Sequence, residues 1–255
     1  MVYLLEEPRR AEKLFEGWEE SLIWSCLQGV MGELYVDDRE RPSAVMAILG
    51  DFSFFAGEPC EELVRYKPKW CSQDFMIMVP QNEKWGELIL SCYKEKAKAV
   101  TRYAIKKEPG IFDREKLQQI AESVPEGFKV KLIDEEVYNW SRGREWCKDW
   151  ASHYDTYEEF RKMGLGVVVT KDGVPVAGAS SYSTYRGGIE VEINTKEEYR
   201  RRSLASVCGA RLILECMKRN LYPSWDAQNK WSVGLAEKLG YHFSHEYPAY
   251  EIWGY

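Results

Sequence analysis

The residues with the clearest chemical potential lie at 190–205, in the order Glu-Val-Glu-Ile-Asn-Thr-Lys-Glu-Glu-Tyr-Arg-Arg-Arg-Ser-Leu-Ala. A strand-like run ends in a polar loop, a basic cluster follows, and small residues then open a helix. Small residues let a ligand approach the backbone closely, and the first N–H groups of a helix are available to an anion. The segment therefore predicts a cradle for a pyrophosphate group.

Three consecutive cations, Arg200, Arg201 and Arg202, stand directly before the predicted helix. The helix macrodipole disfavours cations at this end, so their presence is a local cost that an anionic ligand would offset. The alternative is that the arginines only decorate a solvent-exposed helix start.

Two carboxylates precede the cradle on a predicted strand. Glu190 and Glu192 alternate with Ile189, Val191 and Ile193, which places both carboxylates on one face. Two neighbouring carboxylates are expected to raise each other's pKa, and a general base works best with a pKa near the working pH. We expect one of the two to accept a proton, directly or through water. The alternative is a solvent-exposed face on which the pair only keeps the strand soluble.

The elements that must position these groups lie in the C-terminal half. Asn229 predicts the N-cap of a helix over 230–239, and Gly240 predicts its end. Strand patterns and turn residues around this helix predict an order of strand, helices, three antiparallel strands, helix, strand, helix and strands. The strands are expected at 128–133, 166–170, 174–182, 189–194, 222–227 and within 241–253, with earlier helices at 135–150 and 157–163.

The N-terminal half repeats this order more weakly. It predicts helices over 8–28, 58–64 and 85–96, and strands over 33–35, 44–49, 52–55, 75–79 and 100–106. A charged helix within 113–127 ends in Pro-Glu-Gly and marks the predicted join. We therefore expect an N-terminal domain at 1–125, formed by a degenerate duplication, and a C-terminal domain at 126–255.

The cradle resembles the acyl-CoA loop of the GNAT superfamily of N-acetyltransferases, whose pattern is Arg or Gln, two residues, Gly, one residue, then Gly or Ala. Here it is Arg200, Ser203 and Ala205, with Ser where the pattern prefers Gly. Residues 229–241 are similar to the last helix of the family, Asn-x-x-Ser/Ala with a Leu-Gly-Phe/Tyr end. This segment begins 29 residues after Arg200, a spacing typical of the family.

The resemblance implies an α/β protein of α+β mixed-sheet type, with the GNAT acyl-CoA N-acyltransferase fold in the C-terminal domain and a degenerate GNAT-like N-terminal half. It implies acetyl-CoA as cofactor and transfer to a primary amine of a small molecule within a ternary complex. Glu190 or Glu192 would be the catalytic base. The implied cofactor-binding residues are Ile193, Asn194, Thr195, Arg200, Arg201, Arg202, Ser203, Leu204, Ala205, Ser206, Asn229 and Ser232.

Within this set, backbone N–H groups of the cradle would bind the pyrophosphate, and Asn229 with its helix would contact the pantetheine arm. A backbone N–H near 193–195 would polarise the thioester carbonyl. The family's usual general-acid Tyr is replaced by Ala236, and Tyr241, Tyr247 and Tyr250 are alternative acids between which the sequence does not choose.

Residues 164–166, 178–183, 188–195 and 222–227, together with the upstream 50–59, look like the zwittermicin-resistance-type group of GNAT acetyltransferases. This likeness does not fix the acceptor. A CoA-binding sensor or scaffold without catalysis, and an acetyltransferase acting on a peptide or protein amine, remain alternatives.

The composition and charge of the chain indicate which classes of partner and cofactor to expect. The 255 residues carry a formal net charge of -6, which argues against a general nucleic-acid binder. The start lacks a basic and apolar signal pattern, and no apolar run is long enough for a membrane helix. Seven scattered Cys without a C-x-x-C pair favour reduced thiols and a cytoplasmic protein, and with only three His we expect no metal site. The sequence leaves the oligomeric state undetermined.

Overall fold

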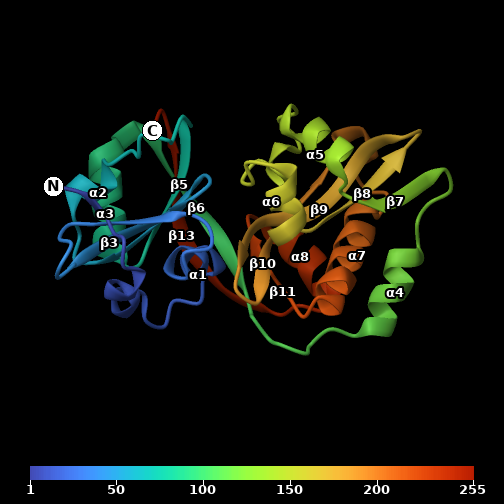
Figure 1. Cartoon of the computed structure of the whole chain (residues 1–255), viewed down its shortest axis with the longest axis horizontal. Helices are drawn as coiled ribbons and strands as arrows, with labels where there is room; N and C mark the ends of the chain where they lie inside the picture. Colours follow the sequence, from blue (N-terminus) through green and yellow to red (C-terminus); the bar gives the residue numbers. More distant parts are fainter. The chain divides into compact units, whose positions relative to one another are not determined.

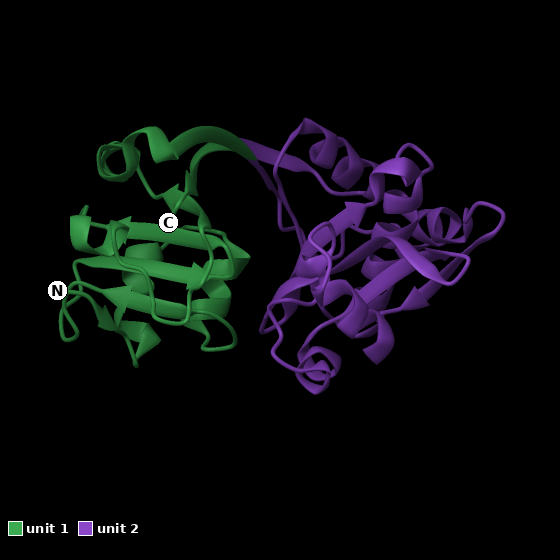
Figure 2. Ribbon diagram, turned by 90° about the horizontal axis from the view of Figure 1, so that it is seen from above, with its two compact units in different colours: residues 1–102, 246–255 green, residues 103–245 purple.

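The computed structural model describes all residues, 1–255, and divides the chain into two compact units (Figure 1 and Figure 2). Unit 1, green in Figure 2, comprises residues 1–102 and 246–255, and unit 2, purple, comprises residues 103–245. The predicted division at 125/126 does not coincide with these units. Helix α4 (Arg114–Glu122) packs against helix α7 (Leu204–Lys218), which places it in unit 2.

Unit 2 is built on a five-stranded sheet. Its strand order is β11 (Tyr222–Ser224), β10 (Gly188–Thr195), β9 (Val174–Tyr185), β8 (Gly166–Lys171) and β7 (Phe128–Leu132). All pairs are antiparallel except β10 with β11, which is parallel. The mixed sheet confirms the predicted fold class.

Different elements pack on the two faces of this sheet. Ala177, Ala179, Ile189 and Val191 join the apolar core beneath α7, whose buried side has helical spacing. Because side-chain positions alternate along a strand, the side-chain position of Gly178 lies on the opposite face. There it meets the ring of Trp150 in the short helix η4 (Lys148–Trp150). Helices α5 (Glu135–Arg142) and α6 (Tyr157–Met163) flank η4 in sequence, and α5 packs against both η4 and α6.

The predicted helix over 135–150 is too long. Helix α5 begins after Asp134, whose side chain accepts a hydrogen bond from the amide of Val137 at 3.0 Å, and it ends at Arg142. Gly143 interrupts it, and the chain resumes with the single turn of η4. The interruption matters because it lets Trp150 turn onto the sheet.

Helix α8 (Lys230–Leu239) has the predicted bounds. The Asn229 side chain accepts from the amide of Ser232, and Gly240 ends the helix in the left-handed region with φ +107°. The predicted strand over 222–227 is divided, because β11 ends at Ser224 and a short strand β12 (Asp226–Ala227) pairs instead with Ala104 and Tyr103 of strand β6 (Ala97–Ile105).

Unit 1 repeats the strand order. The order of its sheet is β1 (Tyr3–Leu4), β2 (Glu33–Val36), β3 (Ala44–Leu49), β4 (Phe52–Gly57), β5 (Phe75–Pro80) and β13 (Phe243–Trp253), followed by β6 and β12. Among the pairs from β1 to β13, only β4–β5 is parallel. Strand β13 joins through Tyr250–Trp253. Helices α2 (Glu61–Val64) and α3 (Glu83–Tyr93) enclose one core, and α1 (Ser21–Leu27) packs on β3.

The predicted N-terminal helix over 8–28 is wrong as a continuous element. It consists of two short 3-10 turns, η1 (Pro8–Arg10) and η2 (Glu12–Phe15), followed by α1. Gly17, with φ +78°, interrupts the run, since no α-helix continues through that conformation. Helix α2 likewise starts later than predicted, after Pro59 and Cys60, and α3 ends at Tyr93 before the turn η3 (Lys94–Lys96).

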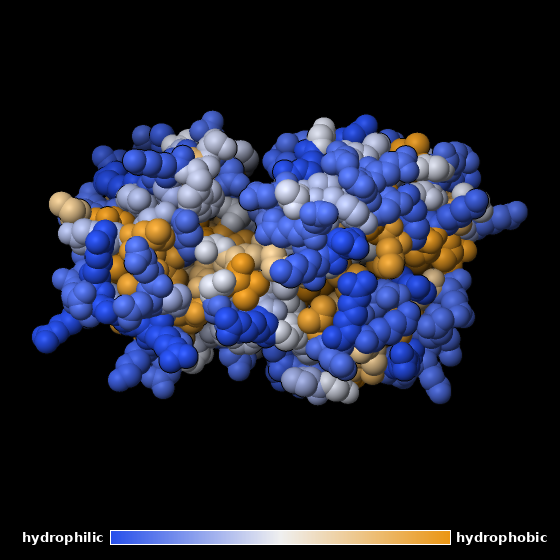
Figure 3. Space-filling view, in the orientation of Figure 1, coloured by the Kyte–Doolittle hydropathy of each residue, from blue (hydrophilic) through white to orange (hydrophobic).

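The outer face drawn in Figure 3 is mostly hydrophilic on each unit, with apolar patches between charged side chains. No helix has the length and apolar character that crossing a bilayer requires. All seven cysteines are free thiols.

The contact between Gly178 and Trp150 can be tested by adding a single methyl group. An ideal Cβ on Gly178 would lie 2.6–2.9 Å from three Trp150 ring atoms, so Gly178→Ala must displace a buried indole. We expect a loss of about 1–3 kcal/mol in the free energy of unfolding, measured by urea denaturation. Gly143→Ala is the matched control. Its Cβ meets nothing within 4 Å and its φ is -89°, so the unfolding free energy should be unchanged or slightly raised. Equal effects of both substitutions would contradict this packing.

Candidate active site

The candidate site begins where two strands of unit 2 part. Strand β10 pairs with β9 along its whole length, but with β11 only at Gly188, Ile189 and Glu190. Beyond this point no strand pairs with the outer edge of β10 from Val191 to Thr195. Alternate backbone groups on such an edge can bind an extended ligand by hydrogen bonds.

Glu190 closes the end of this opening. Its side chain is 5% exposed, and Oε1 accepts a hydrogen bond from the backbone amide of Asp226 at 2.7 Å. That amide lies just after β11 leaves β10, so the carboxylate satisfies a donor near the point where the strands diverge. Of the two predicted bases, Glu190 therefore has a structural task that the sequence did not show.

Glu192 lies farther along the opening. Its cross-strand partner on β9 is Ser180, whereas Glu190 faces Ser183, because Tyr182 is an extra residue in β9 at this register shift. Glu192 is half-buried, in contrast to the nearly buried Glu190. The more accessible carboxylate of the pair is thus the one beside the unpaired edge of β10.

The end of β10 holds the three residues expected near the thioester. Ile193, Asn194 and Thr195 are all half-buried, and Ile193 packs against the core beneath α7. The oxygen atoms Asn194 Oδ1 and Thr195 Oγ1 are buried without a hydrogen-bond partner.

The predicted cradle adopts a conformation that side chains rarely favour. After the turn η5 (Glu197–Tyr199), Arg201 and Ser203 take φ values of +60° and +61°. This left-handed region is where glycine has no steric cost, which gives a reason for the Gly that the related pattern prefers at the Ser203 position. Ser203 is the N-cap of α7 but makes no capping hydrogen bond with its side chain. The first N–H groups of α7, at Leu204, Ala205 and Ser206, thus lack a side-chain cap from this residue.

Cations surround this helix start. Arg200, Arg201 and Arg202 are exposed; Arg200 Nε donates to the carbonyl of Thr195 at 3.4 Å, which ties the loop to the end of β10. A fourth cation comes from α8, since Lys238 Nζ donates to Ser206 Oγ at 3.1 Å. The sequence analysis missed Lys238, because only helix packing brings it here. Four cations at the positive end of a helix dipole favour an anionic ligand.

The start of α8 lies beside the strand divergence. Ser232 donates its amide to Asn229 Oδ1 at 3.0 Å, and its hydroxyl accepts from Trp225 Nε1 at 3.0 Å. Trp225 is buried, so this bond anchors α8 to the segment that leaves the sheet. The helix-capping role predicted for Asn229 is confirmed.

Among the alternative acids, Tyr241 is enclosed in the unit 2 core. It is 2% exposed and its hydroxyl donates to the carbonyl of Pro223 at 2.7 Å. Burial raises the pKa of Tyr241 well above its ordinary value. Its proton is therefore committed to Pro223. Ala236, at the family's acid position, is fully buried.

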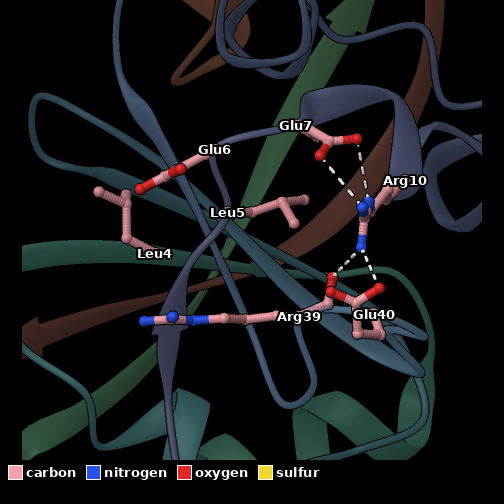
Figure 4. A pocket seen from close by; sticks show the side chains of 7 residues that line it. All are labelled: Leu4, Leu5, Glu6, Glu7, Arg10, Arg39 and Glu40. Carbon is pink, nitrogen blue, oxygen red and sulfur yellow. Dashed lines mark hydrogen bonds and ion pairs between the residues drawn. The ribbon is translucent and has the colours of Figure 1, made fainter.

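The other features that could form a site are a surface histidine and a pocket in unit 1. His242 Nδ1 lies 2.9 Å from Glu108 on the surface, and no group of three or more His, Cys, Asp or Glu is arranged to hold a metal ion. Unit 1 has a pocket of about 220 Å³ near Arg10 (Figure 4). Arg10 already pairs there with Glu7 at 3.0 Å and Glu40 at 2.9 Å, so this guanidinium is engaged by protein carboxylates.

The role of Glu190 in the strand divergence predicts a stability effect. Glu190→Ala leaves the Asp226 amide without this acceptor and should lower the free energy of unfolding by about 1–3 kcal/mol. Glu190→Gln keeps an acceptor oxygen and should lose less, and the exposed Glu158→Ala should change stability by at most about 0.5 kcal/mol. Chemical denaturation of the three variants measures the differences; equal losses for Ala and Gln at position 190 would refute the hydrogen bond's contribution.

A family model described as GNAT acetyltransferase matches residues 12–250. A GCN5-related N-acetyltransferase-like protein from Streptococcus suis is 43% identical, with a TM-score of 0.91 over 97% of this chain and 98% of that chain. The uncharacterized N-acetyltransferase YdfB of Bacillus subtilis is 26% identical over 246 residues, 90% of this chain and 89% of YdfB.

A tandem GNAT protein from the clavulanic acid biosynthesis pathway shares the fold at 10% identity, with a TM-score of 0.56 over 100% of this chain and 99% of that chain. The family match covers nearly the whole sequence, and the two closer relatives are named as N-acetyltransferases or as similar to them. The chain belongs to the GNAT acetyltransferase family and is an N-acetyltransferase.

Proposed function

We propose that this enzyme transfers the acetyl group of acetyl-CoA to a primary amine of a small molecule, directly and within a ternary complex. The observation that carries the proposal is the start of α7, where uncapped N–H groups and four cations adjoin the end of β10. This arrangement suits a pyrophosphate at one end and an extended pantetheine arm along the unpaired strand edge.

Different segments of unit 2 would bind the pyrophosphate, the pantetheine arm and the thioester of acetyl-CoA. The amides of residues 201–206 would bind the pyrophosphate, with positive charge from the arginines and Lys238. Asn229 and Ser232 would hold the α8 start beside the pantetheine. A backbone N–H within Ile193–Thr195 would bind the thioester oxygen, which places a hydrogen-bond donor where negative charge develops.

Acetyl-CoA supplies the acetyl thioester, whose carbonyl carbon forms a bond to the amine nitrogen as the carbon–sulfur bond breaks. Glu192 takes the proton that the ammonium acceptor must lose, directly or through one water. Its charge also attracts a cationic acceptor. As the carbon–sulfur bond breaks, the nitrogen loses its second proton to water, the departing thiolate takes a proton from water, and Glu192 returns its proton to solvent. The hydroxyl of Tyr241, one of the three alternative acids, donates to the carbonyl of Pro223.

The proposal also covers the subgroup and the origin of unit 1. The similar segments of the sequence, such as 178–183 and 188–195, support membership of the zwittermicin-resistance-type group within the family. The meander, helix and parallel strand of unit 1 support a degenerate duplication of a GNAT-like domain, in which the four-residue helix α2 takes the place of the 15-residue α7 of unit 2. The short α2 supports assigning catalysis to unit 2 in this proposal.

The cradle is tested by calorimetric titration with acetyl-CoA. Arg200→Glu and Ser203→Glu put negative charge beside the proposed pyrophosphate site and should each weaken binding at least about tenfold, or about 1.4 kcal/mol. Lys162→Glu, an equal charge change at an exposed position of α6, is the control and should bind as the wild type.

Titration with S-acetylpantetheine, which lacks the pyrophosphate, sharpens this test. The wild type should bind acetyl-CoA far more tightly, and the two cradle variants should lose most of that difference. A wild type that does not bind acetyl-CoA would refute the cofactor assignment. Equal weakening by Lys162→Glu would show a general charge effect in place of a cradle.

The base is tested by turnover. Glu192→Gln removes proton acceptance with little change in size and should lower kcat by about 10²–10⁴-fold in a thiol-release assay with primary amines, while acetyl-CoA affinity stays within twofold. Raising pH should partly restore the variant, because more acceptor is then already deprotonated. Glu158→Gln is the surface control, and unchanged kcat in Glu192→Gln would eliminate this residue as the base.

A further inference from the structure

Buried polar atoms without partners gather near Glu192. Buried polar groups in folded proteins are nearly always hydrogen-bonded, so each exception calls for an explanation. Among the six such side-chain atoms of this chain are Trp150 Nε1, Ser183 Oγ and Asn194 Oδ1. Ser183 and Asn194 lie on β9 and β10 on either side of the Ser180–Glu192 pair.

Trp150 is held firmly in place. It is fully buried, its ring meets Trp146 edge-on with centroids 5.0 Å apart, and its carbonyl accepts from Ser180 Oγ at 2.5 Å. Arg142 of α5 donates to the carbonyl of the next residue, Ala151, at 3.1 Å. The indole is thus a fixed donor, because its N–H cannot turn toward another partner.

The Trp150 ring and the Asn194 side chain both lie next to Gly178, on the same face of the sheet. Trp150 Cε2, which bears Nε1, lies 2.7 Å from the ideal Cβ position of Gly178. Gly178 is the cross-strand partner of Asn194, and directly opposed residues share a face. A donor-only atom and an acceptor atom therefore flank the site where Gly178 has no side chain.

The candidate base lies on this same face. Glu192 and Asn194 are two residues apart on β10, so their side chains point the same way at a spacing of about 7 Å. Asn194 and Glu192 are both only half-buried, so each keeps part of its surface accessible. An acceptor amine beside Glu192 can thus place a neighbouring group against Asn194 and Trp150.

We propose that Trp150 Nε1 and Asn194 Oδ1 form a specificity subsite for a hydroxyl group of the acceptor, with Ser183 providing a further polar wall. A hydroxyl is the smallest group that accepts from an N–H and donates to a carbonyl oxygen at once. The preferred acceptors are then primary amines that carry a hydroxyl on a nearby carbon. This inference rests on the proposed acetyl transfer and names its substrate class.

The test compares two acceptors that differ by one oxygen, trans-2-aminocyclohexanol and cyclohexylamine, with kcat/KM measured by thiol release. The wild type should prefer the hydroxylated amine at least tenfold. Asn194→Leu, which keeps the size but removes the acceptor, should reduce the ratio to about threefold or less. Trp150→Phe removes the donor and should reduce the ratio in the same direction.

The ratio of the two rates makes the test specific, because a general defect lowers both. If Trp150→Phe does not fold, Asn194→Leu alone decides. A wild type without preference, no turnover of the hydroxylated amine, or an unchanged ratio in Asn194→Leu would overturn the subsite. Acetyl-CoA calorimetry on the same preparations reports separately on the proposed function, since cofactor binding does not depend on the acceptor.

Discussion

The site depends on the separation of two parallel strands that hydrogen-bond for only three residues. A strand that leaves a sheet exposes backbone groups that must find other partners. Here the carboxylate of Glu190 accepts the amide of Asp226, and the hydroxyl of Tyr241 donates to the carbonyl of Pro223. Trp225, between them in the chain, is buried and bound to α8. These hydrogen bonds satisfy backbone groups at the end of β11 and just after it, beside the unpaired edge of β10.

The cradle at the other end of β10 depends on a balance of unfavourable terms. Two non-glycine residues lie in the left-handed region, and four cations crowd the positive end of α7. The apolar core beneath α7 holds the helix start in position despite these costs. A bound pyrophosphate would compensate the charges, so the features that make this loop unfavourable by itself are the ones that the proposed anion would stabilise.

Elements whose ends are set by neighbouring residues in the sequence were predicted well, and those whose ends depend on tertiary contacts were not. Asn229 and Gly240 are caps that act within one turn, and they fixed the bounds of α8 correctly. The helix over 135–150 was overpredicted because its pattern continued past Gly143, where packing of Trp150 onto Gly178 decides the outcome. Sequence patterns identified the candidate cradle and the two candidate glutamates, whose roles stay predictions. They could not show that Glu190 binds a distant amide, or that Lys238 reaches the first turn of α7, since both contacts depend on tertiary structure.

The return of the last residues to unit 1 has a consequence for biosynthesis. Ile252 of β13 is fully buried and pairs with Met76 of β5, so the sheet of unit 1 contains a strand segment that is synthesised after unit 2. Until then the edge of β5 is a bare template of the kind that recruits other chains. The residues of unit 2 are all synthesised before Ile252. The sheet of unit 1 therefore stays incomplete while unit 2 is synthesised, and slow synthesis of residues 103–245 prolongs the exposure of that edge.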